Sequence, residues 1–292
     1  MTITRVGLVA KRHLEAAADV LAELAAWIEG RGLHAVFEAE TAVLAGAPAG
    51  HQTASRDDLP GACDVIVLLG GDGTLIGMAG RIAHAGVDVP ILGVNFGSLG
   101  FLTEITLEEL YVSLETVLDG TAAIDERMML RSRTLRAGAV VEDRFALNDV
   151  VITRGALSRI IDLSIEISTQ PAMRVRADGL IVASPTGSTA YNLAAGGPIV
   201  HPAVDALLLT PIAPHMLTNR PIVIPASSEV RVSPATDGHE EVYVTFDGQS
   251  GHPIETNDVI CITRAERALR LVGAPTRTYF DVLREKLKWS QR

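Results

Sequence analysis

Residues 65–74, with the sequence VIVLLGGDGT, constrain the fold more than any other stretch of the chain. The apolar run VIVLL contains no polar residue and predicts a strand that is buried on both faces. After it, apolar residues from Leu75 to Ala83 recur at helical spacing, and this helix is expected to end near Gly86. Residues 70–74 are therefore expected to form a tight turn, and the helix N-terminus that follows favours an anion such as phosphate.

The glycines of this turn and its aspartate suggest different chemistry. Gly70, Gly71 and Gly73, followed by Thr74, are expected to take positive φ angles and to leave no Cβ between the backbone and a ligand. Asp72 is an uncompensated anion that would repel a phosphate unless a metal ion stood between them, so it is better suited to hold a hydroxyl that attacks phosphorus. An ordinary Asp-Gly turn at a strand end is the simpler explanation, and five residues do not decide between the two.

Composition and charge narrow the class of protein. The 292 residues are 48% apolar and 21% charged, which predicts about two domains with proper cores. A net charge of −10 argues against nucleic-acid binding, which needs a basic surface. Cys63 and Cys261 are too few for a disulfide framework, the N-terminus lacks a signal-peptide core, and no apolar run is long enough for a bilayer. We therefore expect a cytoplasmic protein that does not bind membranes.

The order of the expected elements predicts an α/β domain over residues 1–122. Strands and helices alternate there, which is typical of a parallel sheet covered on both faces. Besides the strand and helix around Asp72, we expect strands at 6–10, 33–37 and 90–94, a polar connection at 46–61, a helix at 14–29, and a second helix that Thr106 and Glu109 cap and that runs through Leu118.

The pattern changes after residue 120. Apolar and polar residues alternate from 161 to 167, and similar patterns recur near 230–232, 242–246 and 259–262, which predicts half-buried strands. Residues 123–266 are therefore expected to form a β-rich, sandwich-like domain. The last segment, 267–292, carries a short amphipathic helix at 279–289 that is expected to pack back on the first domain.

Four more segments carry polar groups that suggest a binding site. They are Asn95–Leu102, Asn148–Asp149 within the apolar run ALNDVVI, Asp178–Tyr191 (DGLIVASPTGSTAY) with Gly196–Pro198, and Asp247–Gln249. Taken singly, the glycine-containing turn at 95–102 is better explained by loop geometry. A strand-end cap explains Asn148 and Asp149 as well as binding does, and Ser/Thr turn chemistry does the same for the hydroxyl-rich segment. The chain has neither a P-loop nor a GxGxxG fingerprint, and its eight histidines show no metal-binding spacing.

Together and in this order, the glycine turn and the four segments closely resemble the NAD kinase family. The resemblance implies an ATP-dependent kinase that phosphorylates the 2′-hydroxyl of the adenosine ribose of NAD, with its active site between an α/β domain and a β-sandwich-like domain. It also implies homodimers or homotetramers, for which the apolar segment 211–223 is a candidate interface. The substrates would be NAD and ATP, with glycine-turn amides and a divalent cation, Mg²⁺ or Mn²⁺, holding the triphosphate.

The resemblance also assigns roles to residues. Asp72 matches the family's proposed base, with Gly73 beside it, and Asn148 with Asp149 matches the pair that holds the adenosine, although relatives often have Glu at position 149. Arg159 lies where some relatives have a histidine. The remaining matches are the adenine segment Thr189, Ala190, Tyr191, Asn192, Leu193 and Ala194, in which Tyr191 stacks on the base; the pair Arg176 and Asp178, in which Asp178 accepts from the nicotinamide carboxamide; and the contacts Ala213 and Gln249.

Two alternative functions remain open from the sequence. Diacylglycerol- and sphingosine-type lipid kinases share the glycine turn at 70–74, but residues 184–191 favour NAD as the acceptor. A non-catalytic NAD(P)-binding regulator is the other alternative, and Asp72 argues against it because a pure binder has little use for a carboxylate at that turn.

Overall fold

The computed structural model describes residues 3–47, 50–97, 99–155, 160–216, 218–235 and 241–289. The chain divides into two compact units. Unit 1 comprises residues 1–126 and 269–292, and unit 2 comprises residues 127–268. Cys63 and Cys261 are both buried and unpaired, as their number predicts.

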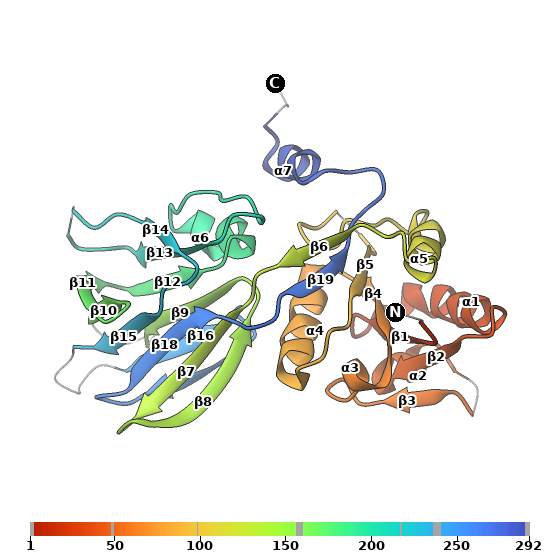
Figure 1. The fold of residues 1–292 in the computed structure, drawn as a ribbon, viewed down its shortest axis with the longest axis horizontal. Helices are drawn as coiled ribbons and strands as arrows, with labels where there is room; N and C mark the ends of the chain where they lie inside the picture. The colour runs from red at the N-terminus through yellow and green to blue at the C-terminus, as the bar shows by residue number, and fades with distance from the viewer. Residues whose placement is uncertain are drawn as a thin grey trace. The chain divides into compact units, whose positions relative to one another are not determined.

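Unit 1 is built on a seven-stranded sheet of order β3-β2-β1-β4-β5-β19-β6 (Figure 1). The strands from β3 to β19 pair in parallel. In sequence order they are β1 (Arg5–Ala10), β2 (His34–Glu38), β3 (Gln52–Ala54), β4 (Val65–Gly70), β5 (Ile91–Asn95), β6 (Ile124–Arg127) and β19 (Leu269–Val272).

Helices cover this sheet because its central strands are apolar on both faces. All six residues of β4 are buried, as the VIVLL run predicts. Val65, Val67 and Leu69 share a core cluster with apolar residues of the first and fifth helices, while the fourth helix packs against β4 and β19. The helices are α1 (Ala18–Glu29), preceded by a 3₁₀ turn at Glu15–Ala17, α2 (Ala39–Leu44), α3 (Leu59–Ala62), α4 (Asp72–Ala85), α5 (Leu110–Leu118) and α7 (Tyr279–Leu287).

Two local expectations for unit 1 are wrong. The polar connection at 46–61 contains the edge strand β3 and the start of α3, because a solvent-facing edge strand needs no apolar pattern. Glu109 accepts from the Thr106 amide at 3.0 Å, but α5 begins only at Leu110 and has no side-chain cap. Glu109 instead ties down the C-terminal segment, through the Thr276 hydroxyl at 2.6 Å and the Arg277 guanidinium at 3.0 Å.

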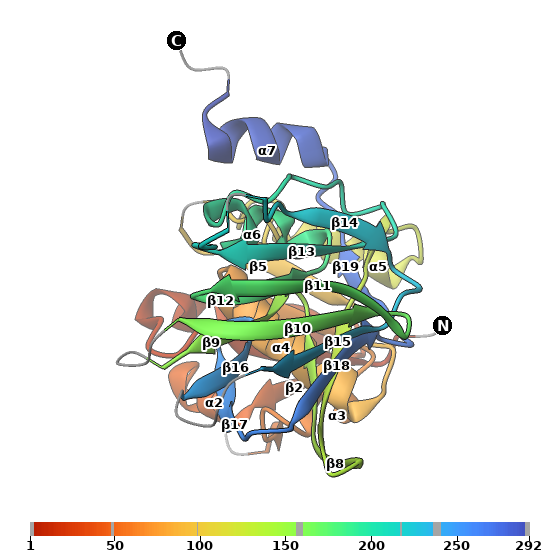
Figure 2. The same cartoon turned by 90° about the vertical axis from the view of Figure 1, so that its left-hand side faces the viewer.

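Unit 2 consists of two six-stranded antiparallel sheets, ordered β11-β10-β15-β18-β7-β8 and β14-β13-β12-β9-β16-β17 (Figure 2). Apolar residues of both sheets, including Leu163, Ile165, Leu180 and Val182, form one core cluster, so the two inner faces pack on each other. The strands are β7 (Leu130–Arg136), β8 (Ala139–Ala146), β9 (Asp149–Arg154), β10 (Ile161–Ile167), β11 (Gln170–Ala177), β12 (Gly179–Ala183), β13 (Ala206–Ile212), β14 (Ile222–Pro225), β15 (Val230–Pro234), β16 (Val242–Phe246), β17 (Ser250–Ile254) and β18 (Val259–Arg264).

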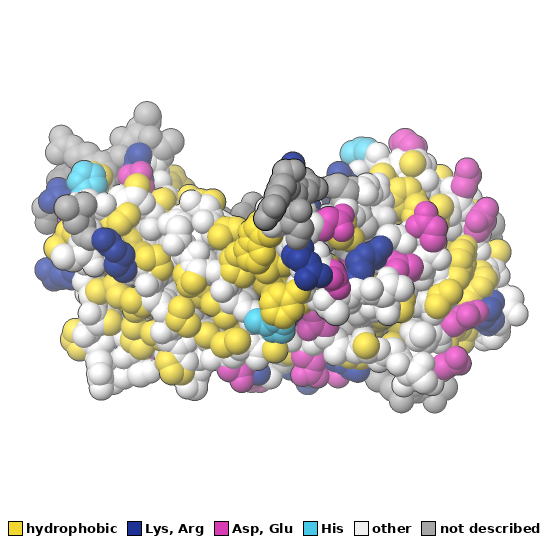
Figure 3. All heavy atoms as spheres, turned by 90° about the horizontal axis from the view of Figure 1, so that it is seen from above, with side chains coloured by type: hydrophobic (Ala, Val, Ile, Leu, Met, Phe, Trp, Pro, Cys, Tyr) yellow, Lys and Arg dark blue, Asp and Glu magenta, His cyan; other side chains and the backbone are white. Residues whose placement is uncertain are grey.

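The predicted fold class is confirmed: one unit has a mostly parallel sheet with helices, and the other is a β-rich domain of two antiparallel sheets. No helix among the described residues is long and apolar enough to cross a bilayer. On the face shown in Figure 3, Lys and Arg side chains are dispersed among acidic and apolar ones.

Candidate active site

The glycine turn joins β4 to α4 without the positive φ angles expected from the sequence. Gly71 has φ −129° and ψ −178°, which is extended backbone, and Gly73 already lies within α4. The need for glycine at the start of the turn is steric instead. A Cβ on Gly70 would lie 3.1 Å from Thr74 Oγ1 and 3.2 Å from Lys11 Cβ, whereas Gly71 and Gly73 border open space. The turn therefore presents bare backbone at the N-terminus of a 14-residue helix.

Asp72, the first residue of α4, is not the uncompensated anion that the sequence suggested. Its Oδ1 accepts from the Leu102 amide at 3.1 Å, from the Thr103 amide at 3.0 Å and from the Thr103 hydroxyl at 3.0 Å. Among the described residues, its Oδ2 accepts from the Phe101 amide alone, at 2.8 Å. An ionised carboxylate has about four acceptor sites on its two oxygens, so Oδ2 keeps the capacity to accept from a ligand.

The loop after β5 is shaped around this carboxylate. A Cβ on Gly100 would overlap Asp72 Oδ1 and Thr103 Oγ1, so only glycine fits there. Asn95, the last residue of β5, accepts from the Gly97 amide at 2.8 Å, and Ser98 lies outside the described residues. A cavity of about 380 Å³ adjoins Asn95 and is closed on another side by Arg277 and Glu285 of the C-terminal segment, all within unit 1.

In unit 2 the predicted pair Asn148 and Asp149 lies at the start of β9, where a third residue holds it. Asp247 follows β16, and its carboxylate accepts from three successive amides: Leu147 at 2.8 Å, Asn148 at 2.7 Å and Asp149 at 3.0 Å. The Asp247 amide in turn donates to the Asp149 carbonyl at 2.9 Å. Asp247 has φ +52°, an unusual backbone angle for a non-glycine residue. Its carboxylate thus fixes the backbone that carries the candidate adenosine contacts.

Burial changes the acid–base behaviour of Asp149. The residue is only 4% exposed, and burial, followed by repulsion from Asp247, raises the pKa of its carboxyl to about 7. Burial also raises the pKa of Asp247, although the three amides that it binds oppose this shift. At neutral pH Asp149 therefore exists in both protonation states, so a ligand whose hydroxyls donate to it would favour the ionised state.

Replacing Asp149 with asparagine tests this pKa. As the pH rises from about 4 to 7, an unfolded Asp149, with an ordinary pKa near 3.9, loses its proton while the folded one keeps it, so the wild type loses stability over that window. The variant lacks this loss, and its free energy of unfolding relative to wild type should increase by up to a few kcal/mol between pH 4 and pH 8. Denaturant titrations at the two pH values measure the difference, and parallel pH dependence of the two proteins would contradict the raised pKa.

The hydroxyl-rich segment after β12 folds against the same end of the sheet. Ser184 Oγ donates to the Leu147 carbonyl at 2.5 Å and accepts from the Gly187 amide at 3.1 Å. A Cβ on Gly187 would overlap the Asn148 carbonyl, so this glycine permits the close approach of the two segments. The 3₁₀ turn Thr186–Thr189 and the helical turn α6 (Tyr191–Ala194) then follow.

Residues of the predicted adenine segment differ in what they offer a ligand. Tyr191 is 47% exposed, so part of its ring faces solvent and can be reached by a ligand. Asn192 is fully buried; its amide nitrogen donates to the Ser188 and Pro198 carbonyls, and its oxygen accepts from the Thr210 hydroxyl at 2.6 Å. Thr189, Ala190, Leu193 and Ala194 are at least partly exposed.

Of the pair predicted for the nicotinamide, Asp178 lies at the opposite end of this sheet, whereas Arg176 lies on β11 of the other sheet. Asp178 precedes β12 and pairs with Arg154, the last residue of β9, at 2.7 Å. Arg176 is exposed, and Ala213, just after β13, has φ +45°. Asp149 and Arg154 are the two ends of the six-residue strand β9, so about 17 Å of strand separates the two groups.

Arg159 and Gln249 are the remaining predicted residues, and a third residue of the site, Arg154, was not predicted from the sequence. Arg159 lies outside the described residues. Gln249 is exposed and lies two residues after Asp247. The backbone N–H of Gln249 donates to the Phe246 carbonyl at 2.9 Å. Arg154, the ion-pair partner of Asp178, was missed because only the pairing of Thr153 with Gly179 brings the two side chains together. Its position at the end of an apolar run was the one available signal.

Comparisons with known proteins agree with these features. Residues 6–122 match the ATP-NAD kinase N-terminal domain, and residues 147–274 match the ATP-NAD kinase C-terminal domain. The chain is 48% identical to the NAD kinases of Geotalea daltonii and Geobacter sulfurreducens over 288 residues, with 99% of each chain covered.

Two solved structures share the fold. Yeast NADH kinase complexed with NADH has a TM-score of 0.88 at 24% identity, covering 100% of this chain and 89% of the yeast chain. An NAD kinase from Archaeoglobus fulgidus in complex with ATP has a TM-score of 0.74 at 23% identity, covering 98% and 99%. With both domains matched and close relatives aligned over almost their full length, the chain belongs to the ATP-NAD kinase family.

Proposed function

We propose that this protein transfers the γ-phosphoryl group of ATP to the 2′-hydroxyl of the adenosine ribose of NAD, forming NADP and ADP. The full-length similarity to NAD kinases carries the proposal. The exposed glycine turn and the spare acceptor capacity of Asp72 supply the groups that phosphoryl transfer needs, namely phosphate-binding amides and an oxygen that orients the attacking hydroxyl.

Within unit 1, Asp72 Oδ2 is the atom that would receive the ribose proton. The four hydrogen bonds to the carboxylate fix its position. A carboxylate is only a modest base, so Asp72 acts mainly by orienting the hydroxyl and accepts the proton late, once the bond to phosphorus is forming. Gly73, beside it in α4, leaves room for the ribose.

Within unit 2, the groups at the start of β9 would bind the adenosine. The Asp149 carboxylate accepts from ribose hydroxyls, Asn148 contacts the adenosine, and Tyr191 stacks on the adenine. At the other end of the sheet, Asp178 accepts from the nicotinamide carboxamide, and its pairing with Arg154 orients it. Arg159, Arg176, Ala213 and Gln249 complete the proposed contacts.

Tyr191→Ala should weaken NAD binding more than it slows phosphoryl transfer. The ring is half exposed, so its removal leaves the core intact, and a lost base–aromatic stack costs about 1–3 kcal/mol. We expect KM for NAD to rise while kcat is largely kept, as measured by steady-state kinetics at saturating ATP. An unchanged KM for NAD would remove Tyr191 from the site.

The divalent cation, Mg²⁺ or Mn²⁺, is expected to arrive with the phosphates of ATP. The described residues contain no group of three or more His, Cys, Asp or Glu side chains that could hold a metal ion. Mg²⁺ in kinases is commonly held by substrate phosphates, water and one or two carboxylates, and this chain fits that mode. The cation would offset the charge of two polyanions brought together on a protein with net charge −10.

Chelation tests the cation requirement. EDTA in excess over total divalent metal should abolish NADP formation, because without the cation the charge of the transferred phosphoryl group is not compensated. Added Mg²⁺ or Mn²⁺ should restore NADP formation. Full turnover in EDTA would contradict the role of the cation.

We also infer a cytoplasmic homodimer or homotetramer. The apolar side chains of Val204, Met216 and Val223, near β13 and β14 of unit 2, are each about half exposed, and burial against a second copy would remove them from water. Leu217, within the candidate interface 211–223, lies outside the described residues. Light scattering of the purified protein should give a mass of two or four chains, and a monomer at micromolar concentration would overturn the inference.

One assay separates the proposed reaction from its alternatives. The protein is incubated with ATP, Mg²⁺ and NAD, and NADP is detected with an NADP-specific dehydrogenase. An NAD kinase forms NADP; a lipid kinase consumes ATP only when a lipid alcohol is added; a regulator binds NAD without consuming ATP. Absence of NADP with intact, folded protein would overturn the proposal.

A further inference from the structure

A cavity of about 480 Å³ lies in unit 1 outside the groups described so far. It opens beyond the carboxyl ends of β1 and β2, and Lys11, Arg12, Arg56, Thr41, Val43 and Leu44 are among the residues that line it. Small-molecule sites typically enclose about 300–1,000 Å³, so the cavity has the size for a nucleoside.

The sheet topology places this cavity next to the glycine turn. The chain runs from β1 outward to β2 and β3 and then returns to the other side of β1 as β4, so the strand order reverses between β1 and β4. In open α/β sheets, ligands bind at such a switch point, outside the carboxyl ends of the strands. Lys11 follows β1 there; its amide donates to the Leu69 carbonyl at 2.8 Å, and its Cβ lies against Gly70.

Lys11 is available to a ligand. It is exposed, and its ammonium group has no hydrogen-bond or ion-pair partner among the residues that the structure describes. A free ammonium between a phosphate-binding turn and a cavity is suited to bind a phosphate that bridges the two.

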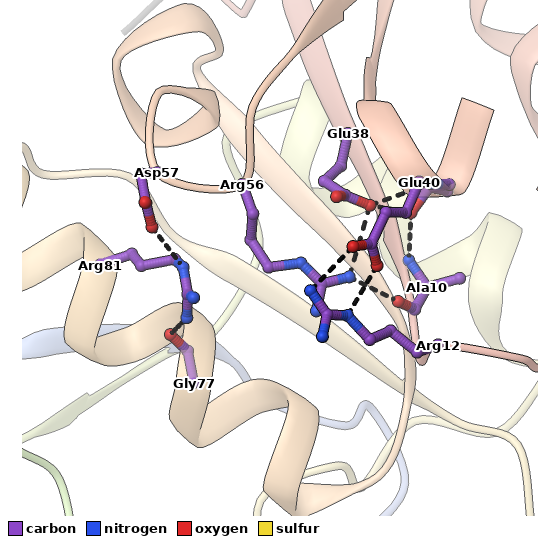
Figure 4. Close-up of polar contacts among 9 residues, drawn as sticks. Ala10, Arg12, Glu38, Glu40, Arg56, Asp57, Gly77 and Arg81 are labelled. Carbon is purple, nitrogen blue, oxygen red and sulfur yellow. Dashed lines mark hydrogen bonds and ion pairs between the residues drawn. The ribbon is translucent and has the colours of Figure 1, made fainter. Parts of the chain in front are cut away.

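Two arginines also border the cavity, each in contact with a carboxylate (Figure 4). Arg12 pairs with Glu40 at 2.6 Å, but both side chains are more than half exposed, and such pairs contribute little. Arg56 donates to the Ala10 carbonyl at 3.1 Å and to Glu38 at 3.3 Å, while its buried Nε has no hydrogen-bond partner among the described residues. Arg12 and Arg56 are thus each paired with a carboxylate, Glu40 and Glu38 respectively, and Glu15 also lines the cavity. Lys11 is therefore the cation of the cavity that has no ion-pair partner among the described residues.

One wall of the cavity is apolar. Val43 on α2 is 83% exposed although it borders the cavity, and Leu44 follows it. An exposed valine beside guanidinium groups suits a flat, partly apolar ring better than a bare phosphate chain, because a base can contact both the aliphatic side chain and the faces of the arginines.

We propose that this cavity binds the nucleoside of the ATP donor and that Lys11 binds the phosphates between the cavity and the glycine turn. The inference rests on the proposed kinase function and assigns the donor site to unit 1. It predicts that changes at Lys11 and Val43 affect ATP and leave NAD unaffected.

Equilibrium binding of a non-hydrolysable ATP analogue and of inorganic tripolyphosphate, with Mg²⁺ and without NAD, tests the site by calorimetry. Lys11→Met should weaken both ligands by about tenfold or more, because it removes a charge-assisted phosphate contact. Val43→Asn keeps the charge of the site and should weaken the analogue about threefold to tenfold through the lost apolar contact, with no change for tripolyphosphate. The matched controls in the same unit are Lys288→Met and Val112→Asn, both on exposed side chains and both expected to bind as wild type.

Kinetics of NADP formation separate failure of this inference from failure of the proposed function. If the wild type forms NADP, Lys11→Met and Val43→Asn should raise KM for ATP and leave KM for NAD unchanged. Equal weakening of both ligands by Val43→Asn would place phosphates, not the nucleoside, in the cavity. Wild-type binding by both folded variants would overturn the site entirely, whereas a wild type that forms no NADP would overturn the proposed reaction instead.

Discussion

Asp72→Asn is expected to lower kcat for NADP formation by about 10²- to 10⁴-fold, the range for loss of a general base. The amide keeps the shape of the side chain but has neither the charge nor the basicity to take the ribose proton. KM for NAD should change far less, because the side chain can still form a hydrogen bond with the hydroxyl. Steady-state kinetics over both substrates measure the two effects separately.

The same substitution should also lower stability, contrary to what an uncompensated carboxylate would predict. Four donors converge on Asp72, and an asparagine NH₂ group placed at either oxygen position would face at least one of them. An unsatisfied buried donor costs about 1–3 kcal/mol, which denaturant titration can resolve. Thr103→Val is the matched control: it removes one donor and leaves the acid, so it should cost some stability and much less of kcat. A folded Asp72→Asn enzyme with kcat within about threefold of wild type would exclude Asp72 as the base.

Asp247→Ala should destabilise unit 2 by about 3 kcal/mol or more, because three backbone amides lose their acceptor at once. The backbone at the start of β9, which carries Asn148 and Asp149, would then lose its fixed geometry, so KM for NAD should rise as well. Removing Asp247 also removes the charge that helps to raise the pKa of Asp149, and the pH dependence of stability should become shallower.

The control for this prediction is Asp178→Ala in the same unit. Asp178 forms an ion pair with Arg154, but both side chains are about one-third exposed, and such a pair contributes no more than about 1 kcal/mol. Thermal and denaturant unfolding of the two variants should therefore differ clearly. Equal stability of Asp247→Ala and Asp178→Ala would show that the Asp247 carboxylate does not stabilise the backbone at the start of β9.

The amino-acid sequence by itself determined the features that depend on neighbouring residues. Apolar runs and alternation specify β4 and β10 because a side chain's face in a strand follows from its position alone. The helix after Asp72 follows from spacing in the same way. The order of the motifs along the chain likewise predicted the family to which the chain belongs.

Only the tertiary structure decided what surrounds the candidate site residues. The donors to Asp72 lie 29 to 31 residues away in sequence, and the amides that Asp247 binds lie 98 to 100 residues away. The raised pKa of Asp149 likewise depends on burial and on Asp247 across the sheet. Local patterns carry no information on these pairings, because strand register and loop packing, rather than sequence spacing, bring the groups together. The sequence thus identified Asp72 and Asp149 as chemically important, and the fold determined how many hydrogen bonds the first accepts and at what pH the second ionises.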